Sequence, residues 1–173
     1  MGFFDKLLKG NEELIEWQNT IMTTKSSRLY VNKNQLEAAT VKMVANNMRI
    51  FDDSAKLVNS TTKPDVFFSR LELAEEKLTA LVRIEPFMKY VKSITVNQSL
   101  ASLLNEFQEN RNKYILDFLY RYYWNVKEKA EGMKTEKGKQ NQFLKFRENL
   151  EPYTDQFNDT TMKIYESMCQ QKI

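Results

Sequence analysis

The chain has 173 residues, of which 42% are hydrophobic and 28% are charged, and its formal net charge is +3. This length and balance fit one globular domain with a packed core. The sequence contains no His and a single Cys, so an internal disulfide is excluded, and the usual zinc, di-iron and His-dependent catalytic sites lack their ligands or bases. We therefore expect a protein that is not an enzyme and that uses no metal and no cofactor.

Breaker residues are scarce, because the whole chain contains only 4 Gly and 3 Pro. That number is too small to supply the turns of a many-stranded β fold, and long segments without a breaker favour helices. No run of about 20 apolar residues is present, so we expect no membrane span. The first residues lack the pattern of a signal peptide and the lone Cys fits a reducing compartment, which together predict a cytoplasmic protein.

The first ten residues form a short amphipathic segment that Gly10 ends, and we expect residues 11–173 to form a single helical domain. The apolar face of this segment consists of Phe3, Phe4, Leu7 and Leu8, with Lys6 and Lys9 beside it. Aromatic and Leu side chains next to Lys are typical of a helix that lies in a membrane interface. Docking of the same face onto the rest of the bundle is the other interpretation and the one that its length favours, because so short a helix needs something to pack on.

Long segments with apolar residues at helical spacing follow along the chain. A helix is predicted over residues 12–25 and another over 34–60, where two adjacent apolar stripes indicate cover on more than one side. Pro64 suits the first turn of the next helix, which Pro86 is expected to end or bend. Residues 87–94 are expected to add a helical turn or two.

The longest predicted helix runs from about residue 98 to residue 131, and Gly132 is placed to end it. A basic loop at 134–139 follows, and then helices at about 140–150 and 160–170, separated by Pro152. The apolar stripes all need partners. The sequence therefore predicts an all-α bundle of five to seven helices with one long central helix near residues 98–131.

Polar residues also interrupt the apolar stripes. Asn47 and Arg111 sit at stripe positions, and Asp117 and Arg121 have the i,i+4 spacing of an ion pair. We interpret these residues as fixing helix register. Cys169 has no His to activate it and is interpreted as a small apolar residue or a free thiol.

A candidate partner patch lies on the long helix, away from its main apolar stripe. At 100° per residue, the patch falls roughly opposite Phe118, and its members are Leu116, Tyr120, Tyr123 and Trp124. Aromatic residues are favoured at protein interfaces, so this face predicts a partner site. Cover by another helix of the same chain is the alternative.

The basic loop is a second candidate surface, with Lys134, Lys137 and Lys139 as its cations. Such a cluster is able to contact phosphates, which would make the chain a nucleic-acid-binding protein. Lys residues that follow a helix C-terminus also complement the helix dipole, and this structural interpretation stays open beside the functional one.

Several stretches of the chain carry a family resemblance. They are Lys63–Arg70, Glu109–Arg111 with Tyr114, Ile115, Asp117 and Phe118, then Arg121–Tyr123, Lys134–Lys139 and Leu150–Tyr153. Together these stretches resemble a loose group of small uncharacterised bacterial proteins, some from mobile elements. The likeness covers roughly residues 60 to 155, and some members share the Gly-Phe-Phe-Asp-Lys opening. The resemblance implies a helical fold and a bacterial or mobile-element origin, and it implies no activity.

These observations favour a non-catalytic helical protein-interaction module that binds an unknown protein partner. The N-terminal segment would add a peripheral contact with the inner face of the membrane. The alternative is a nucleic-acid-associated accessory protein of a phage or mobile element that uses the basic loop 134–139. The sequence leaves the oligomeric state open.

Overall fold

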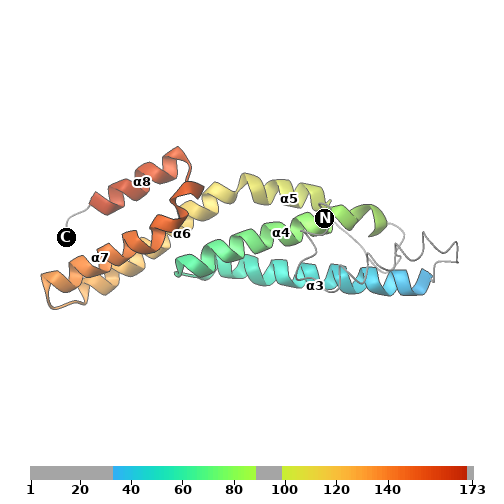
Figure 1. Cartoon of the computed structure of the whole chain (residues 1–173), viewed down its shortest axis with the longest axis horizontal. Helices are drawn as coiled ribbons and strands as arrows, with labels where there is room; N and C mark the ends of the chain where they lie inside the picture. Colours follow the sequence, from blue (N-terminus) through green and yellow to red (C-terminus); the bar gives the residue numbers. More distant parts are fainter. Residues whose placement is uncertain (1–32, 89–98, 171–173) are drawn as a thin grey trace. The chain divides into compact units, whose positions relative to one another are not determined.

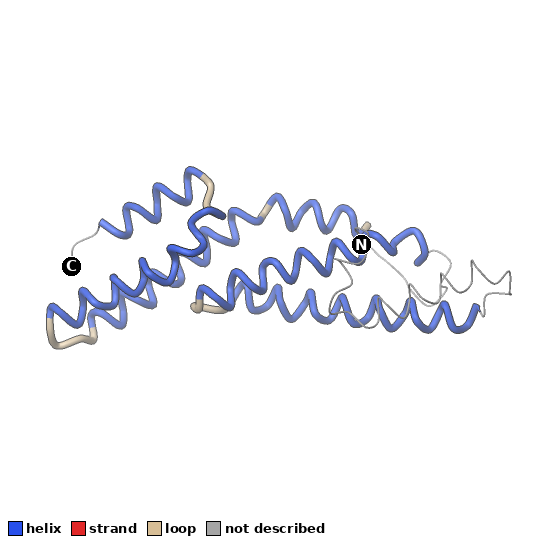
Figure 2. Tube along the Cα trace, viewed as in Figure 1, coloured by secondary structure: helices blue, strands red, loops and turns tan. Residues whose placement is uncertain are grey.

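A computed structural model describes residues 33–88 and 99–170 of the chain. Throughout this described part the regular structure is helical, with no strand (Figures 1 and 2). Its α-helices are α3 (Lys33–Ser60), α4 (Pro64–Met88), α5 (Leu100–Glu109), α6 (Arg111–Glu131), α7 (Glu136–Leu150) and α8 (Asp159–Gln170), and the 3-10 helix η1 (Glu151–Gln156) lies between the last two. The predicted all-α class is confirmed. The helix predicted over 12–25 lies outside the described residues.

The described residues group into two compact units, each built from separate stretches of the chain. The first contains residues up to Phe51 together with Glu76–Leu104, and the second contains Asp52–Glu75 together with residues from Asn105 onward. Each unit has its own buried residues. The predicted boundary at residue 10 lies outside the described part of the chain.

In the first unit, apolar residues of α3 and α4 are fully or almost fully buried, among them Met43, Leu78, Leu81 and Ile84. The carboxylate of Glu85 accepts a hydrogen bond from the backbone N–H of Leu100, at 3.1 Å between Oε1 and N. The first N–H groups of a helix have no partner within the helix, so this contact satisfies one of them and ties the start of α5 to α4.

The second unit is built around aromatic rings. Phe67 of α4 and Phe118 of α6 are both fully buried, and their rings stack with centroids 4.1 Å apart. Phe68 stacks on Tyr153 of η1, also at 4.1 Å. Helices α6 and α7 run antiparallel beside each other (Figure 1) and pack through Tyr122 and Phe146. The aromatic rings therefore join α4, α6, α7 and η1 into one core.

Two helix boundaries before α7 differ from the sequence prediction. The expected long helix is present as α5 and α6, which meet at Asn110. The backbone N–H of Asn110 still donates to Glu106 and its carbonyl accepts from Tyr114, so helical bonding continues through the junction. The sequence predicted that Pro86 ends or bends its helix. Helix α4 continues through Pro86 to Met88, so Pro86 does not end it. Pro64 is the first residue of α4, as predicted.

Asn47 is a polar residue with no exposed surface in the core of the first unit. Its Nδ2 donates to the carbonyl oxygen of Met43 at 2.8 Å, while its Oδ1 has no hydrogen-bond partner among the described residues. An unsatisfied buried acceptor costs about 1–3 kcal/mol of folding free energy. Leu has a similar size and carries no such cost.

We therefore expect Asn47→Leu to raise the melting temperature by about 2–8 °C, measured by circular dichroism at 222 nm. Asn59→Leu is the matched control, because Asn59 makes the same i to i−4 bond, to Ala55, at an exposed position. It should leave the melting temperature unchanged. A fall in melting temperature for Asn47→Leu would show that the amide stabilises the fold.

Candidate interaction surface on α6

The residues of the predicted partner patch on α6 separate into exposed and buried members. Trp124 is 58% exposed and Tyr120 is 43% exposed, whereas Leu116 is half-buried. Tyr123 is buried at 6% exposure, and its ring packs edge-on against Phe143 and Phe146 of α7. Tyr123 is therefore a core residue and is unavailable to a partner. Helix α7 covers that side of α6, which no periodicity within α6 could reveal.

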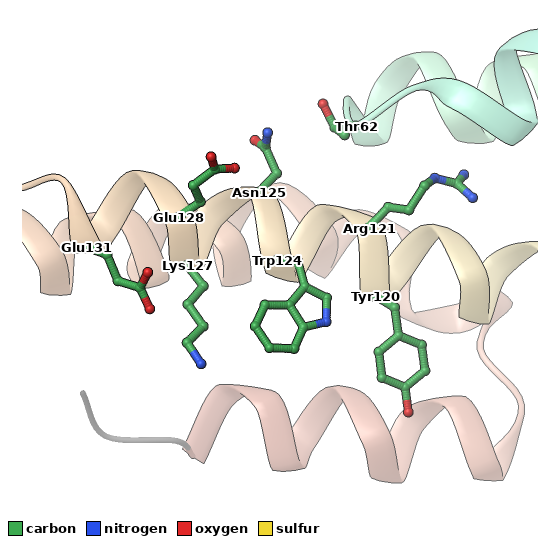
Figure 3. A pocket seen from close by; sticks show the side chains of 8 residues that line it. All are labelled: Thr62, Tyr120, Arg121, Trp124, Asn125, Lys127, Glu128 and Glu131. Atoms are coloured by element: carbon green, nitrogen blue, oxygen red, sulfur yellow. The ribbon is translucent and has the colours of Figure 1, made fainter.

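An open depression lies beside the exposed rings and has a volume of about 600 Å³. It is lined by Thr62, Tyr120, Arg121, Trp124, Asn125, Lys127, Glu128 and Glu131. Figure 3 shows Tyr120, Trp124 and Lys127 on one side of α6, while Arg121, Asn125 and Glu128 point toward the side of Thr62. Aromatic surface and charges of both signs thus line the same depression.

The Lys127 ammonium lies over the indole of Trp124, with Nζ 4.7 Å from the ring centroid. This cation–π contact holds the Lys side chain against the ring. The contact therefore restricts the orientation of the indole, while the residue as a whole remains 58% exposed.

Arg121 joins the opposite side of the depression to the end of α3. Its Nη2 donates to the backbone carbonyl of Val58 at 2.6 Å. The last carbonyls of a helix have no partner within the helix, and a cation there also complements the helix dipole. Burial lowers the pKa of the Arg121 guanidinium, and the charge of Asp117 raises it in part. The main directed contact of Arg121 is therefore with α3, whereas the sequence predicted a pair with Asp117.

The predicted basic loop begins a helix. Thr135 caps α7, with its Oγ1 accepting the backbone N–H of Gly138 at 3.1 Å, so Lys137 and Lys139 lie in the first turns of α7. Lys139 is ion-paired with Glu136 at 2.7 Å between Nζ and Oε1. Lys134 and Lys137 are exposed. The predicted loop is therefore limited to residues 134 and 135, and the prediction is wrong for residues 136–139, where a Thr cap and an acidic residue in the first turn favour a helix.

Sequence reasoning missed a second depression, here called the tip of the α6–α7 hairpin, which begins at the turn between the two helices and extends along α7 to Glu148. Its volume is about 290 Å³, and it is lined by Met133, Gly138, Asn141, Gln142, Leu144, Lys145 and Glu148. Met133 is 38% exposed and Leu144 is 50% exposed. The available signal was the position of Leu144 next to Phe143 and two residues before Phe146, which places it off the buried face of α7.

Arg111 forms a polar network across the second unit. Its Nη1 lies 3.3 Å from Oε2 of Glu75 and its Nη2 lies 2.7 Å from Oε1 of Gln156. Gln108 also donates to Glu75. The network joins α4, α5, α6 and η1, and the prediction that Arg111 fixes helix register stays a prediction.

The thiol of Cys169 is half-buried, and burial raises its pKa. Thiolate, the nucleophilic form, is therefore scarce at neutral pH. Burial, followed by the charge of Cys169 and its hydrogen bond, raises the pKa of Tyr165 to about 12.

Among the residues that the structure describes, no cluster of His, Cys, Asp or Glu is arranged to hold a metal ion. No helix in this part is long and apolar enough to cross a bilayer. Phe3, Phe4, Leu7 and Leu8 lie outside the described residues.

Comparison with known proteins finds no match to any family model, to any curated protein or to any solved structure. The resemblance to small bacterial proteins therefore stays a prediction.

Replacing Arg121 tests its contact with the end of α3. Arg121→Met keeps the apolar stem and removes the donor to Val58, so we expect a loss of about 1–3 kcal/mol in the free energy of unfolding in urea. Asp117→Asn is the control and should change stability by less than about 0.5 kcal/mol, because Asp117 is exposed and only its charge acts on Arg121. The reverse ranking of the two variants would identify the Asp117–Arg121 pair as the stabilising contact.

The raised pKa of Tyr165 predicts how the stability of the fold changes at alkaline pH. Its folded pKa of about 12 exceeds the ordinary value of 10.0, so the stability linked to its protonated phenol is present below pH 10 and is lost as the pH rises toward 12. Tyrosinate absorbance should show a late ionisation near pH 12 that Tyr165→Phe removes. An unchanged late phase in this variant would contradict the assignment.

Proposed function

We propose that this chain is a non-catalytic helical module that binds a protein partner through Leu116, Tyr120 and Trp124 of α6, here called the aromatic ridge. The observation that carries the proposal is the exposure of Trp124 and Tyr120, 58% and 43%, on adjacent turns of one helix. Trp and Tyr are the residues most enriched among those that dominate binding energy at interfaces. A Trp that contributes to the core needs no such exposure, so a role outside the fold accounts for it best.

The spacing of the ridge favours a helical partner. Its three residues are four positions apart, which at 1.5 Å per residue makes a ridge about 12 Å long. An amphipathic helix presents apolar residues at the same spacing and packs them along such a ridge. Lys127, Glu128 and Glu131 border the ridge with both signs of charge. The partner helix is therefore expected to carry a mixed polar rim, with its affinity coming from apolar contact at the centre.

The expected cytoplasmic location, with a peripheral contact of residues 1–10 at the inner face of the membrane, belongs to the same proposal and rests on the sequence alone. The alternative, a nucleic-acid-associated accessory protein using Lys134, Lys137 and Lys139, has weaker support. The ion pair of Lys139 with Glu136 removes much of its charge from the surface available to phosphates.

The proposal predicts that Trp124 dominates partner binding. Tagged chain is incubated with soluble extract of the source organism, and the captured proteins of three forms are compared. We expect a partner that wild type and Leu144→Ser capture and that Trp124→Glu does not. Leu144 is the matched control, because it is a similarly exposed apolar residue on α7.

The partner is then purified and its affinity for Trp124→Ala is measured by calorimetry. A loss of at least about 30-fold is expected for a residue of this kind. Because Trp124 is exposed, the melting temperature should stay within about 2 °C of wild type. Equal capture by Trp124→Glu and wild type would show that the aromatic ridge is not the binding surface.

A further inference from the structure

The tip of the α6–α7 hairpin combines exposed apolar side chains with an excess of cations. Met133 and Leu144, which are 38% and 50% exposed, line one depression together with Lys145. Lys134 and Lys137 are exposed beside it, next in sequence to Met133 and Gly138. Residues 132–148 contain four Lys, one Arg and two Glu, and one of these Glu, Glu136, is ion-paired with Lys139. The remaining charge at the tip is therefore positive.

We propose that this tip docks on an anionic lipid bilayer. Met133 and Leu144 enter the interface, while Lys134, Lys137 and Lys145 contact the headgroup phosphates. An interfacial site needs this pairing, because apolar side chains supply the buried area and Lys supplies attraction to acidic lipid. The proposal is independent of the aromatic ridge, since it rests on different residues.

Two features favour a bilayer over a nucleic acid as the occupant. Contact with a phosphate backbone would leave Met133 and Leu144 unused, whereas a bilayer accommodates both. Arg is the residue best suited to bidentate recognition of phosphates and guanine, and no Arg lines the depression. Lys acts as a point charge, which is sufficient for a fluid layer of headgroups.

Glu148 limits the strength of this docking. Its exposed carboxylate lines the same depression, one turn beyond Leu144, and is repelled by acidic headgroups. We therefore expect weak and reversible binding that falls as salt is added. Replacing this carboxylate by a cation, in Glu148→Lys, should therefore strengthen binding.

The test is co-sedimentation of the purified full chain with vesicles of phosphatidylcholine, with and without phosphatidylglycerol. Wild type should bind the acidic vesicles and not the neutral ones. Lys137→Glu should weaken the partition coefficient by roughly 10-fold or more, at about fivefold for each unit of charge. Leu144→Ser should weaken it by several-fold, and Glu148→Lys should strengthen it by roughly 10-fold or more.

Control variants separate this site from the others. Lys163→Glu replaces an exposed Lys of α8 by the same charge reversal and should change binding less than Lys137→Glu. Trp124→Glu should still bind vesicles, so loss of the partner and loss of the lipid are distinguishable. Melting temperatures by circular dichroism establish that each variant is folded.

Three results would overturn the proposal. The first is no binding of wild type to acidic vesicles. The second is binding that Phe4→Glu abolishes and that the tip variants leave unchanged, which would assign it to the N-terminal segment. The third concerns a labelled DNA duplex in place of vesicles. If wild type and Leu144→Ser bind the duplex, Lys137→Glu does not, and no form binds vesicles, the tip is a site for a phosphate backbone.

Discussion

The second compact unit depends on the stacking of Phe67 on Phe118. Both rings are completely buried, and Phe68 extends the cluster edge-on to Phe118 and face-on to Tyr153. Fully buried aromatic side chains contribute the largest apolar areas in a protein core, and offset stacking adds to that contribution. Because these rings come from α4, α6 and η1, their contact fixes where the later helices are placed. Phe146 and Tyr165 then continue the same cluster into α7 and α8.

Polar contacts are found at the ends of helices in both units. Arg121 reaches the last turn of α3, Glu85 reaches the first turn of α5, and Asn158 accepts the N–H of Thr161 in α8. Each contact supplies a partner to a backbone group that a helix leaves unpaired at its end. Apolar packing decides which helices meet, and these bonds decide where each helix begins and ends. The Arg111 network has a related role, because it joins side chains of four elements near the junction of α5 and α6.

The aromatic ridge and the tip of the α6–α7 hairpin lie on helices whose other faces are buried in the core. Tyr123 and Trp124 are neighbours in sequence, yet Tyr123 packs into α7 while Trp124 faces solvent. Likewise Phe146 is fully buried, and Leu144 of the same helix is half exposed. A rotation of 100° per residue turns neighbouring side chains to different environments. One helical hairpin is therefore able to present an aromatic ridge and a basic, partly apolar tip without weakening its own packing.

The sequence by itself determined the helical class, the course of α3, the start of α4 at Pro64 and the stop of α6 before Gly132, because these follow from local spacing and from breaker residues. It did not determine which apolar residues off the main stripe are covered. Leu116, Tyr120, Tyr123 and Trp124 form one patch by helical spacing, and only the position of α7 removes Tyr123 from it. The sequence prediction of a loop was also wrong for residues 136–139, where the Thr135 cap and the ion pair of Lys139 with Glu136 begin a helix. Exposure depends on contacts between segments distant in sequence, so it is decided by the tertiary structure alone.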